Sequence, residues 1–515
     1  MLVLTAENMK KAEESAVENG CNYYDLMKTA GTKCADVILC ENKNSKVTIL
    51  CGKGRNGGDG LVIAGRLWQN GFRNVFVVLA GGMPTDELCI QMYEEMIKYP
   101  VVVTDFTTDR ETAIYHIETA DVIADALFGI GFRGELSGNY LETVEIANKN
   151  MTASKYAVDI PSGLSADGEY NGKTIFNADK TLTMIAYKPV HVIKTFSDMC
   201  GDISVIDIGI KEDILSPFAE KYSAFIKEEA LNNIRKRDYD SHKGSFANVL
   251  TICGSRNMTG CVYLCNQAAV EIGAGLVTAA FPECIYNTVT AKLNEPLMLP
   301  LKNNDDGRMI ADAKTLLPAM KKADVIAVGC GIGVDNDTKE LVTFIINNYN
   351  GVLILDADAL NCVAKNKEIL KNAECEIVIT PHPGEMSRLT GKSICDIQND
   401  RMQTALDFAH EYGVTVLLKG ADTVVADKTG RCYINTTGNP SMARGGSGDV
   451  LTGLIAGLIR QTEDTFKAVC TGAYIHGMTA DDVVEKYGPL AATPTRIIEN
   501  INNNLSSCLD KQIER

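Results

Sequence analysis

A glycine-rich segment in the second half of the chain has the residue pattern most typical of a catalytic site. In "GGSGDVLTGLIAGLI", residues 445–459, three glycines precede Asp449 at the start of an apolar helix. Glycines let a backbone approach an anion closely, and the first turn of a helix offers N–H groups without helical partners. A phosphate bound there would lie beside Asp449, so we predict that Asp449 is the base that deprotonates an attacking hydroxyl. Simple capping of the helix is the alternative interpretation.

Three further strand ends in this half supply polar side chains. Lys419 follows "VTVLL", His382 lies between two prolines after "EIVIT", and Asp356, Asp358 and Asn361 follow "VLIL". A lysine beside a glycine suits nucleotide phosphates, although a lone lysine is more often solvated and a lone histidine more often structural. Helix capping would equally explain one of the acidic residues. "GSRNMTG" lacks the lysine of a Walker A motif, which argues against P-loop chemistry.

A second glycine-rich segment, "GKGRNGGDG", follows the apolar run "VTILC" in the first half. Gly52, Gly54 and Gly57 fit the G-x-G-x-x-G spacing between a strand and a helix, which favours binding of a dinucleotide pyrophosphate. In a dehydrogenase the next strand ends in a carboxylate for the ribose hydroxyls, but "NVFVVLAGG" ends on Ala80 and two glycines. The sequence therefore argues against a nicotinamide-dependent dehydrogenase.

Oxygen-bearing side chains occur at three strand ends of this first half. Asn56 and Asp59 lie in the glycine-rich segment, Asp125 lies in "DVIADAL", and Asp159 and Ser162 follow "KYAV". Because the carboxyl ends of parallel strands meet at one edge of a sheet, we expect these side chains to lie close together. Amide, carboxylate and hydroxyl oxygens without histidine or cysteine suit a hard cation. Ordinary turns are the alternative explanation.

Two series of alternating strands and helices must position these residues. The first covers residues 45–210 and the second begins near residue 247, with a charged connector between them. Such alternation predicts α/β domains with parallel sheets, the first one a Rossmann-like, three-layer αβα domain. We place the boundary near residue 222, which gives domains 1–222 and 223–515.

Composition limits the partners and the location of the protein. The net charge of −16 over 515 residues argues against nucleic-acid binding, and no apolar run is long enough to span a membrane. The N-terminal segment lacks an export signal, so we expect a cytoplasmic protein whose 17 cysteines are reduced. Cys261 and Cys265 lack second partners for a zinc site, so we interpret the cysteines as small buried apolar residues.

The second half of the chain resembles a known family. "SHKGSFANVL", "GAGLVTAAF", "GCGIG", "LDADALN", "TPHPGEM", "LLKGADT" and "GGSGDVLTG" are together similar to the ribokinase-like dehydratase that repairs hydrated NADH and NADPH with ADP or ATP. The resemblance implies a ribokinase-like αβα domain with Asp449 as the catalytic base. It implies that hydroxyl phosphorylation and phosphate elimination restore the reduced nicotinamide. Ala247 and Arg444 depart from the usual motifs. The residues implied to bind nucleotide are Lys419, Gly420, Ala421, Asp422, Thr423 and Gly448, and those implied to bind substrate are Ala274, Gly333 and His382.

The first half resembles the epimerase that interconverts the two forms of the same hydrates and is commonly fused to that dehydratase. The resemblance, carried by "GKGRNGGDG", "DALFGIGFRGELSG" and "AVDIPSGLSADG", implies that Asp159 is the acid/base group. It implies K⁺ bound by Asn56, Asp125 and Ser162. Arg55 departs from the family by replacing an asparagine. The implied substrate contacts are Arg55, Asn56, Gly57, Gly58, Asp59, Gly129, Ile130, Gly131, Phe132, Arg133, Gly134, Glu135 and Tyr140.

Together the two resemblances predict a bifunctional NAD(P)H-hydrate repair enzyme. The epimerase would convert the R and S forms, and the dehydratase would restore NADH or NADPH from the S form. The expected ligands are K⁺ and ADP or ATP, with Mg²⁺ accompanying the nucleotide, and the expected assembly is a homo-oligomer. The alternative is a ribokinase-like kinase of a vitamin precursor or other small molecule, with an N-terminal binding or scaffold domain.

Overall fold

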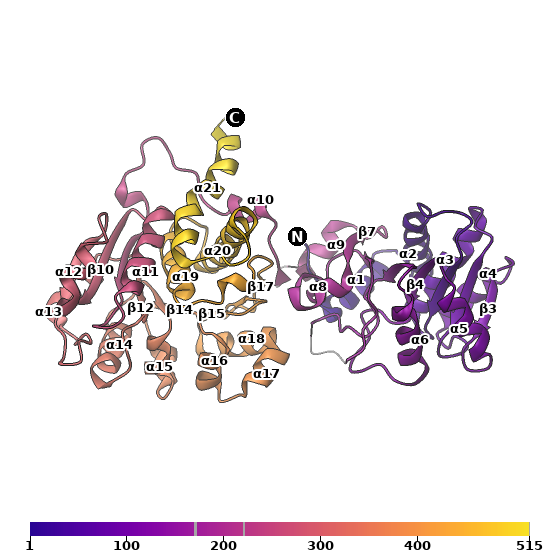
Figure 1. The fold of residues 1–515 in the computed structure, drawn as a ribbon, viewed down its shortest axis with the longest axis horizontal. Helices are drawn as coiled ribbons and strands as arrows, with labels where there is room; N and C mark the ends of the chain where they lie inside the picture. The colour runs from indigo at the N-terminus through magenta and orange to yellow at the C-terminus, as the bar shows by residue number, and fades with distance from the viewer. Residues whose placement is uncertain (169–172, 220–221, 514–515) are drawn as a thin grey trace. The chain divides into compact units, whose positions relative to one another are not determined.

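The computed structural model describes residues 1–168, 173–219 and 222–513 (Figure 1). The chain divides into two compact units, Met1–Ser223 and Ala224–Arg515. Each unit contains a mainly parallel sheet with helices on both faces, which confirms the predicted α/β fold class. No helix within the described ranges is long and apolar enough to cross a membrane.

The sheet of the first unit has the strand order β3-β2-β1-β4-β5-β6-β7, and every pairing is parallel. The order changes direction between β1 and β4, and open α/β sheets bind ligands in the crevice at such a point. The strands are β1 (Val47–Cys51), β2 (Val75–Leu79), β3 (Val102–Asp105), β4 (Val122–Ala126), β5 (Ser154–Val158), β6 (Lys180–Met184) and β7 (Asp202–Ile206).

Both faces of this sheet are buried, because alternate strand residues enter different cores. Val47, Ile49 and Cys51 pack with one set of helices, whereas Leu50 and Ile123 pack with another. The first set is α2 (Tyr23–Ile38), α3 (Arg55–Gln69) and α4 (Glu87–Met96); the second is α5 (Arg110–Glu118) and α6 (Gly138–Lys149). The other elements of the unit are α1 (Ala6–Glu18), α7 (Pro189–Val192), α8 (Lys194–Cys200), α9 (Glu212–Ala219) and β8 (Tyr222–Ser223).

The sheet of the second unit contains the order β11-β10-β9-β12-β13-β14-β15-β16-β17, with antiparallel pairing only from β15 to β17. Here the order changes direction between β9 and β12. The strands are β9 (Asn248–Ile252), β10 (Leu276–Pro282), β11 (Leu297–Leu301), β12 (Val325–Val328), β13 (Val352–Leu355), β14 (Glu376–Ile379), β15 (Thr415–Leu418), β16 (Val424–Ala426) and β17 (Cys432–Ile434).

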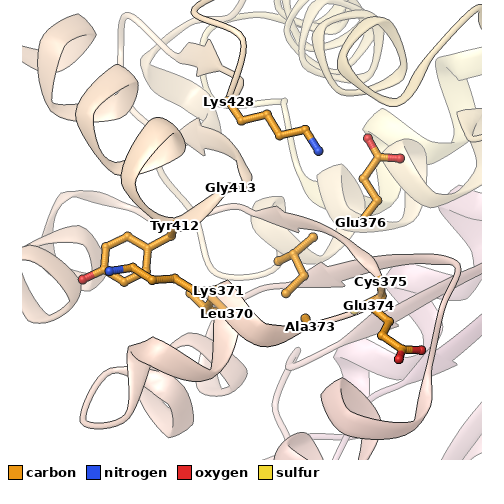
Figure 2. Close-up of a pocket in the computed structure, with 10 residues that line it drawn as sticks. Leu370, Lys371, Ala373, Glu374, Cys375, Glu376, Tyr412, Gly413 and Lys428 are labelled. Atoms are coloured by element: carbon orange, nitrogen blue, oxygen red, sulfur yellow. The ribbon is translucent and has the colours of Figure 1, made fainter.

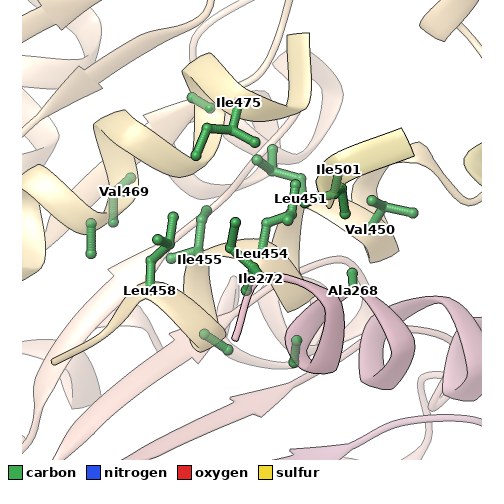
Figure 3. Packing of buried hydrophobic residues seen from close by; sticks show 14 of the residues in the cluster. Ala268, Ile272, Val450, Leu451, Leu454, Ile455, Leu458, Val469, Ile475 and Ile501 are labelled. Carbon is green, nitrogen blue, oxygen red and sulfur yellow. The ribbon is translucent and has the colours of Figure 1, made fainter. Parts of the chain in front are cut away.

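Helix α19 (Ser447–Leu458) forms the centre of the second core (Figure 3). Leu454 and Leu458 are fully buried, as expected for a helix that is apolar on nearly every side. A Cβ at Gly453 would lie 2.1 Å from the Cys265 carbonyl oxygen on α11 (Gly260–Glu271), so only glycine permits this close approach. The packing holds the first turn of α19, which carries Asp449, in a defined position.

The remaining helices cover the sheet of the second unit on both sides. Figure 1 shows α14, α15 and α16 on the opposite side of the strands from α11, α19 and α20. The elements not yet given are α10 (Lys227–Asn232), α12 (Tyr286–Thr290), α13 (Ala313–Met320), α14 (Asn336–Asn348), α15 (Asp358–Val363), α16 (Pro383–Thr390), α17 (Ile394–Asn399), α18 (Arg401–Tyr412), α20 (Thr465–Tyr487), α21 (Pro494–Ile513) and the 3₁₀ turns Lys243–Ser245, Glu283–Ile285, Lys367–Asn372 and Pro440–Met442.

Candidate active sites

Asp159 forms a buried ion pair with Lys188 at the carboxyl end of β5. The Lys188 Nζ atom lies 2.6 Å from Asp159 Oδ1, and it also donates to Thr183 Oγ1 at 2.8 Å and to the Met184 carbonyl at 2.9 Å. Burial opposes ionisation of Asp159, but the charge and the hydrogen bond of Lys188 outweigh it and lower the pKa of Asp159. The Asp159 side chain is therefore a carboxylate at neutral pH.

Other titratable groups surround this pair. Burial, reinforced by the charge of Asp159, raises the pKa of Glu13 to about 7 and that of Asp59 well above its ordinary value. His191 Nδ1 accepts a hydrogen bond from the Lys188 backbone at 3.1 Å, and its buried Nε2 has no hydrogen-bond partner among the described residues. Burial and the neighbouring Lys188 lower the pKa of His191 to about 3. The site thus combines one ionised carboxylate with carboxyl groups that retain protons and a neutral imidazole.

The predicted cation ligands lie at the ends of β4 and β5 and at the start of α3. Asp125 accepts hydrogen bonds from the Ser162 backbone and hydroxyl, both at 2.7 Å, and from the Leu127 backbone at 3.1 Å. All three donors are neutral, and burial raises the pKa of Asp125 to about 6. A fully buried carboxyl group that adjoins the Ser162 hydroxyl and has no positively charged hydrogen-bond donor among these partners fits a hard monovalent cation such as K⁺.

Asn56, the third predicted cation ligand, adjoins Asp159. Its Nδ2 atom donates to the Val158 carbonyl at 3.2 Å. A Cβ atom at Gly129 would lie 3.4 Å from Asn56 Oδ1 and 3.0 Å from Asp159 Oδ2, so the three residues adjoin one another. The structure therefore brings together side chains that are more than a hundred residues apart in the sequence.

The first predicted substrate segment, Arg55–Asp59, is the first turn of α3, which begins at Arg55. A Cβ at Gly57 would lie 2.0 Å from the Gly52 carbonyl oxygen, so the glycine spacing serves a tight strand-to-helix connection. Gly58 lies in the same turn and is buried. The Arg55 guanidinium lies 4.4 Å from the centre of the Tyr23 ring. The tight connection and the Arg55–Tyr23 contact are both structural, so substrate binding by this segment stays a prediction.

The second predicted substrate segment, Gly129–Glu135 with Tyr140, is held by aromatic and ionic contacts. The Phe128 ring lies 4.7 Å from that of Tyr140 and 4.9 Å from that of Phe132. Arg133 donates to Asp167 at 3.0 Å. Phe132 is buried, Ile130 is half-buried against apolar neighbours, and Gly131, Gly134 and Glu135 are exposed. These residues border the Asn56 and Asp159 site through Gly129, and their contact with substrate stays a prediction.

A second buried ion pair joins the ends of β13 and β15 in the other unit. Asp356 Oδ1 lies 2.7 Å from Lys419 Nζ and accepts from Thr380 Oγ1 at 2.7 Å, while Oδ2 accepts from Thr452 Oγ1 at 3.0 Å. Burial opposes both charges, yet their attraction lowers the pKa of Asp356 and raises that of Lys419. Ala357, the next residue, has a φ of 47°, a strained value for a residue other than glycine.

Asp449 faces this ion pair from the first turn of α19. A Cβ at Gly448 would lie 3.5 Å from Lys419 Nζ and 3.6 Å from Asp356 Oδ2. Burial, followed by the charge of Asp356, raises the pKa of Asp449 to about 6. An ammonium group, backbone N–H groups at a helix start and a carboxyl that titrates near neutrality therefore meet at one point, as phosphoryl transfer to a hydroxyl requires.

Arg401 supports the predicted nucleotide segment Lys419–Thr423. Its guanidinium donates to the Leu418 carbonyl at 2.8 Å and to the Asp422 carbonyl at 2.9 Å, and burial lowers its pKa to about 10. Gly420 donates to Thr423 Oγ1 at 3.2 Å, and Ala421 is exposed. The segment is a braced turn at the carboxyl edge of the sheet, and nucleotide binding there stays a prediction.

His382 and Gly333 lie at this same edge, after β14 and β12. His382 Nδ1 accepts from the Gly384 and Glu385 backbones at 3.0 and 3.3 Å, so it caps α16. Its side chain is 51% exposed, and its contact with substrate stays a prediction. Gly333, with a φ of 79°, donates to Asp358 at 2.9 Å.

Ala274 does not fit the predicted site. It precedes β10, whereas Gly333 and His382 follow their strands, so it lies at the opposite edge of the sheet. The seven residues of β10 span about 20 Å at roughly 3.3 Å each. Ala274 instead packs against the apolar core, away from the other candidate substrate contacts.

A pocket of about 530 Å³ also lies at that opposite edge (Figure 2). Glu376 and Gly413, at or before the starts of β14 and β15, contribute to it together with Lys371, Tyr412 and Lys428. It contains none of the predicted site residues, and its position away from the strand carboxyl ends separates it from the chemistry described above.

Sequence reasoning missed the residues that act through tertiary contacts. Lys188 and Glu13 belong to segments without a motif, and Arg401 begins a helix far from the turn that it braces. One signal was available for Lys188, because a single charge within the apolar run "TMIAYKPVHVI" requires a buried partner.

Comparisons with known proteins match both halves of the chain. Residues 249–503 match the family described as NAD(P)H-hydrate dehydratase, and residues 23–190 match that described as YjeF-related protein N-terminus. A bifunctional NAD(P)H-hydrate repair enzyme of Moorella thermoacetica is 35% identical over 477 residues, covering 90% of this chain and 89% of that protein. Its namesake in Coxiella burnetii is 32% identical over 505 residues, covering 96% and 97% respectively.

Among solved structures, an ADP/ATP-dependent NAD(P)H-hydrate dehydratase from Bacillus subtilis, co-crystallised with ATP and Mg²⁺, is 28% identical with a TM-score of 0.46. The match covers 55% of this chain and 98% of the Bacillus subtilis protein. The full-length sequence relatives decide the assignment. This chain belongs to the family of bifunctional NAD(P)H-hydrate repair enzymes, as its motifs predicted.

Proposed function

We propose that the first unit epimerises hydrated NADH and NADPH, and that the second dehydrates the S form at the expense of ADP or ATP. Membership of the family supports both activities. The observation that carries the dehydration chemistry is the meeting of Gly448 and Asp449 with the Lys419 and Asp356 pair. An epimerase in the same chain lets both forms of the damaged cofactor be recovered.

In the second unit, Asp449 is the base. It takes the proton of the substrate hydroxyl as that oxygen attacks the terminal phosphorus of the nucleotide, and the bond from phosphorus to the leaving nucleotide breaks. Lys419 and the N–H groups at the start of α19 stabilise the phosphate charge. Loss of phosphate from the ring, together with a proton from the neighbouring carbon, then restores the reduced nicotinamide. Mg²⁺ bound with the nucleotide would offset part of its negative charge.

In the first unit, Asp159 is the acid/base group at the epimerised carbon. Its pairing with Lys188 keeps it ionised, so it is ready to accept a proton at neutral pH. Glu13 and Asp59, whose pKa values are raised, are placed to hold a proton nearby. Asn56, Asp125 and Ser162 are the ligands that we assign to K⁺, whose charge would compensate Asp125. The substrate lies against Arg55–Asp59, Gly129–Glu135 and Tyr140.

The assembly and location are proposals as well. We propose a cytoplasmic homo-oligomer, which light scattering on the purified protein would test through its molar mass. A mass equal to that of one chain, 55.8 kDa, would reject the oligomer.

The test of the function is recovery of the reduced nicotinamide. Purified protein is mixed with hydrated NADH containing both epimers and with ADP or ATP, and the absorbance of the reduced ring is followed. We expect complete recovery with the wild type, none with Asp449→Ala, and recovery limited to the S form with Asp159→Asn. No recovery with the wild type would reject the repair function, and full recovery of both epimers by either variant would reject the role of its residue.

A further inference from the structure

Three buried cysteines lie together beside the dehydratase site. The sulfur atoms of Cys253, Cys265 and Cys330 are all within 4.8 Å of one another, and none of the three residues is exposed. Cys253 follows β9 and Cys330 follows β12, the two strands between which the strand order changes direction, and Cys265 projects from α11. The fold thus gives Cys265 the thiol partners that its sequence neighbours do not provide. The proposed dehydration uses none of these thiols.

Cys330 links this cluster to the catalytic carboxyl groups. Its sulfur lies within 4.8 Å of carboxylate oxygens of both Asp356 and Asp449, and it is 3.7 Å from Asp356 Oδ2. Asp449 is only partly buried, so the cluster has a polar side toward the site as well as apolar neighbours such as Val262 and Phe281.

We propose that Cys253, Cys265 and Cys330 form a binding site for a thiophilic divalent cation of the Zn²⁺ type, with Asp449 as the fourth ligand. Zinc–sulfur bonds of about 2.3 Å in a tetrahedral site place sulfur atoms roughly 3.8 Å apart. The sulfurs therefore need to approach by no more than about 1 Å, which is within reach of side-chain rotation. The Asp449 carboxylate is grouped with Cys330 but not with Cys253 or Cys265, so it must rotate further toward the cluster to become the fourth ligand. Three thiolates and one carboxylate are a ligand set that zinc accepts.

The binding reaction balances without any oxidant. Each thiol releases its proton to solvent as its sulfur binds the cation, so three protons leave for one divalent ion bound. The resulting complex carries net negative charge, and Lys419 is the nearby cation that offsets it. The alternative is that these buried thiols only pack as small apolar residues. In that case they keep their protons when the cation is added, so proton release distinguishes the two possibilities.

Occupation of the site also has a consequence for catalysis. A cation bound to Asp449 removes the lone pair that accepts the substrate proton, so dehydration stops while epimerisation in the other unit continues. This consequence rests on the proposed role of Asp449, whereas cation binding itself does not.

Binding is tested with the reduced full-length chain in a background that lacks the exposed thiols of Cys40, Cys284 and Cys395. Co²⁺, a spectroscopic substitute for Zn²⁺, should give a thiolate-to-metal charge-transfer band that saturates at one ion per chain and disappears when Zn²⁺ is added. Cys330→Ala should abolish the band. The matched control Cys470→Ala, which removes a buried thiol of the same unit outside the cluster, should retain it.

A second measurement does not depend on how the variants fold. Zn²⁺ added to the wild type in weak buffer should release close to three protons per ion bound. Release of fewer than two protons, absence of the charge-transfer band, or a band that persists in Cys330→Ala would each overturn the proposed site. Saturating Zn²⁺ that leaves dehydration unchanged would overturn the assignment of Asp449 as a ligand. If the protein did not repair the hydrate at all, the spectral and proton measurements would still decide the binding.

Discussion

Replacing Asp449 with asparagine should make the second unit more stable at neutral pH while removing its activity. Burial raises the pKa of Asp449 from 3.8 to about 6, so the folded state binds the proton more tightly than the unfolded chain does. Each pKa unit corresponds to about 1.36 kcal/mol, which gives a cost of about 3 kcal/mol for the ionised carboxyl above pH 6. Below pH 3.8 the carboxyl is protonated in both states and the cost vanishes.

Asparagine has nearly the same shape and no charge, so it removes this cost. We expect wild type and Asp449→Asn to be equally stable near pH 3.8 and the variant to gain stability as the pH rises to 6. Above pH 6 the difference should remain constant at about 3 kcal/mol. The variant should lose dehydration by roughly 10²- to 10⁴-fold, as expected for removal of a general base, and retain epimerisation.

Urea unfolding of the full chain between pH 4 and 8 measures the difference. Far-UV circular dichroism follows both units, whereas fluorescence of Trp68, the only tryptophan in the sequence, follows the first unit. The Trp68 transition should be the same in both proteins, and the remaining dichroism transition should shift. A stability difference that is equal at all pH values, or one that is absent at pH 8, would refute the reasoning.

Three further changes test the two sites. Lys188→Met leaves the buried Asp159 without its partner and should cost about 3–5 kcal/mol in the Trp68 transition, with dehydration unchanged; a loss below 1 kcal/mol would contradict the ion pair's importance. Replacing K⁺ with tetramethylammonium should lower the Trp68 unfolding midpoint in the wild type but not in Asp125→Asn, and equal shifts in both would exclude Asp125 as a ligand. Gly448→Ala adds a methyl group about 3.5 Å from the Lys419 Nζ atom, so the protein should fold, with a KM for ADP or ATP raised roughly tenfold in steady-state assays; an unchanged KM would place the nucleotide elsewhere.

The sequence was most informative about strands buried on both faces. Val352–Leu355 is a continuous apolar run, and Val47–Cys51 is apolar apart from Thr48, because helices cover both sides of a parallel sheet; both strands were predicted. The edge strand β11 (Leu297–Leu301) was missed, since it is largely unburied and contains Pro300. The sequence also did not predict that Arg55–Asp59 is helical, because its glycines disfavour a helix. Tertiary packing overrides that preference.

For the candidate sites, the sequence predicted a residue's position in the fold where that residue directly follows its strand. Asp159 and Lys419 are examples, because parallel topology alone places such residues at one edge. It failed where position depends on the whole fold. Ala274 lies two residues before its strand rather than after it, and Lys188 reaches Asp159 from the segment after β6. Neither position follows from local periodicity.

Both units use the same electrostatic arrangement but assign the catalytic role differently. In each, a strand-end carboxylate is paired with a buried lysine, Asp159 with Lys188 and Asp356 with Lys419, and the backbone is strained at Asp159 and beside Asp356. The paired carboxylate stays ionised, and its charge raises the pKa of an unpaired neighbour, so the two acids of a site divide their roles. In the first unit the proposed catalytic group is the paired Asp159, whereas in the second it is the unpaired Asp449. Dehydration should therefore decline below pH 6, where Asp449 gains a proton, while Asp159 remains a carboxylate.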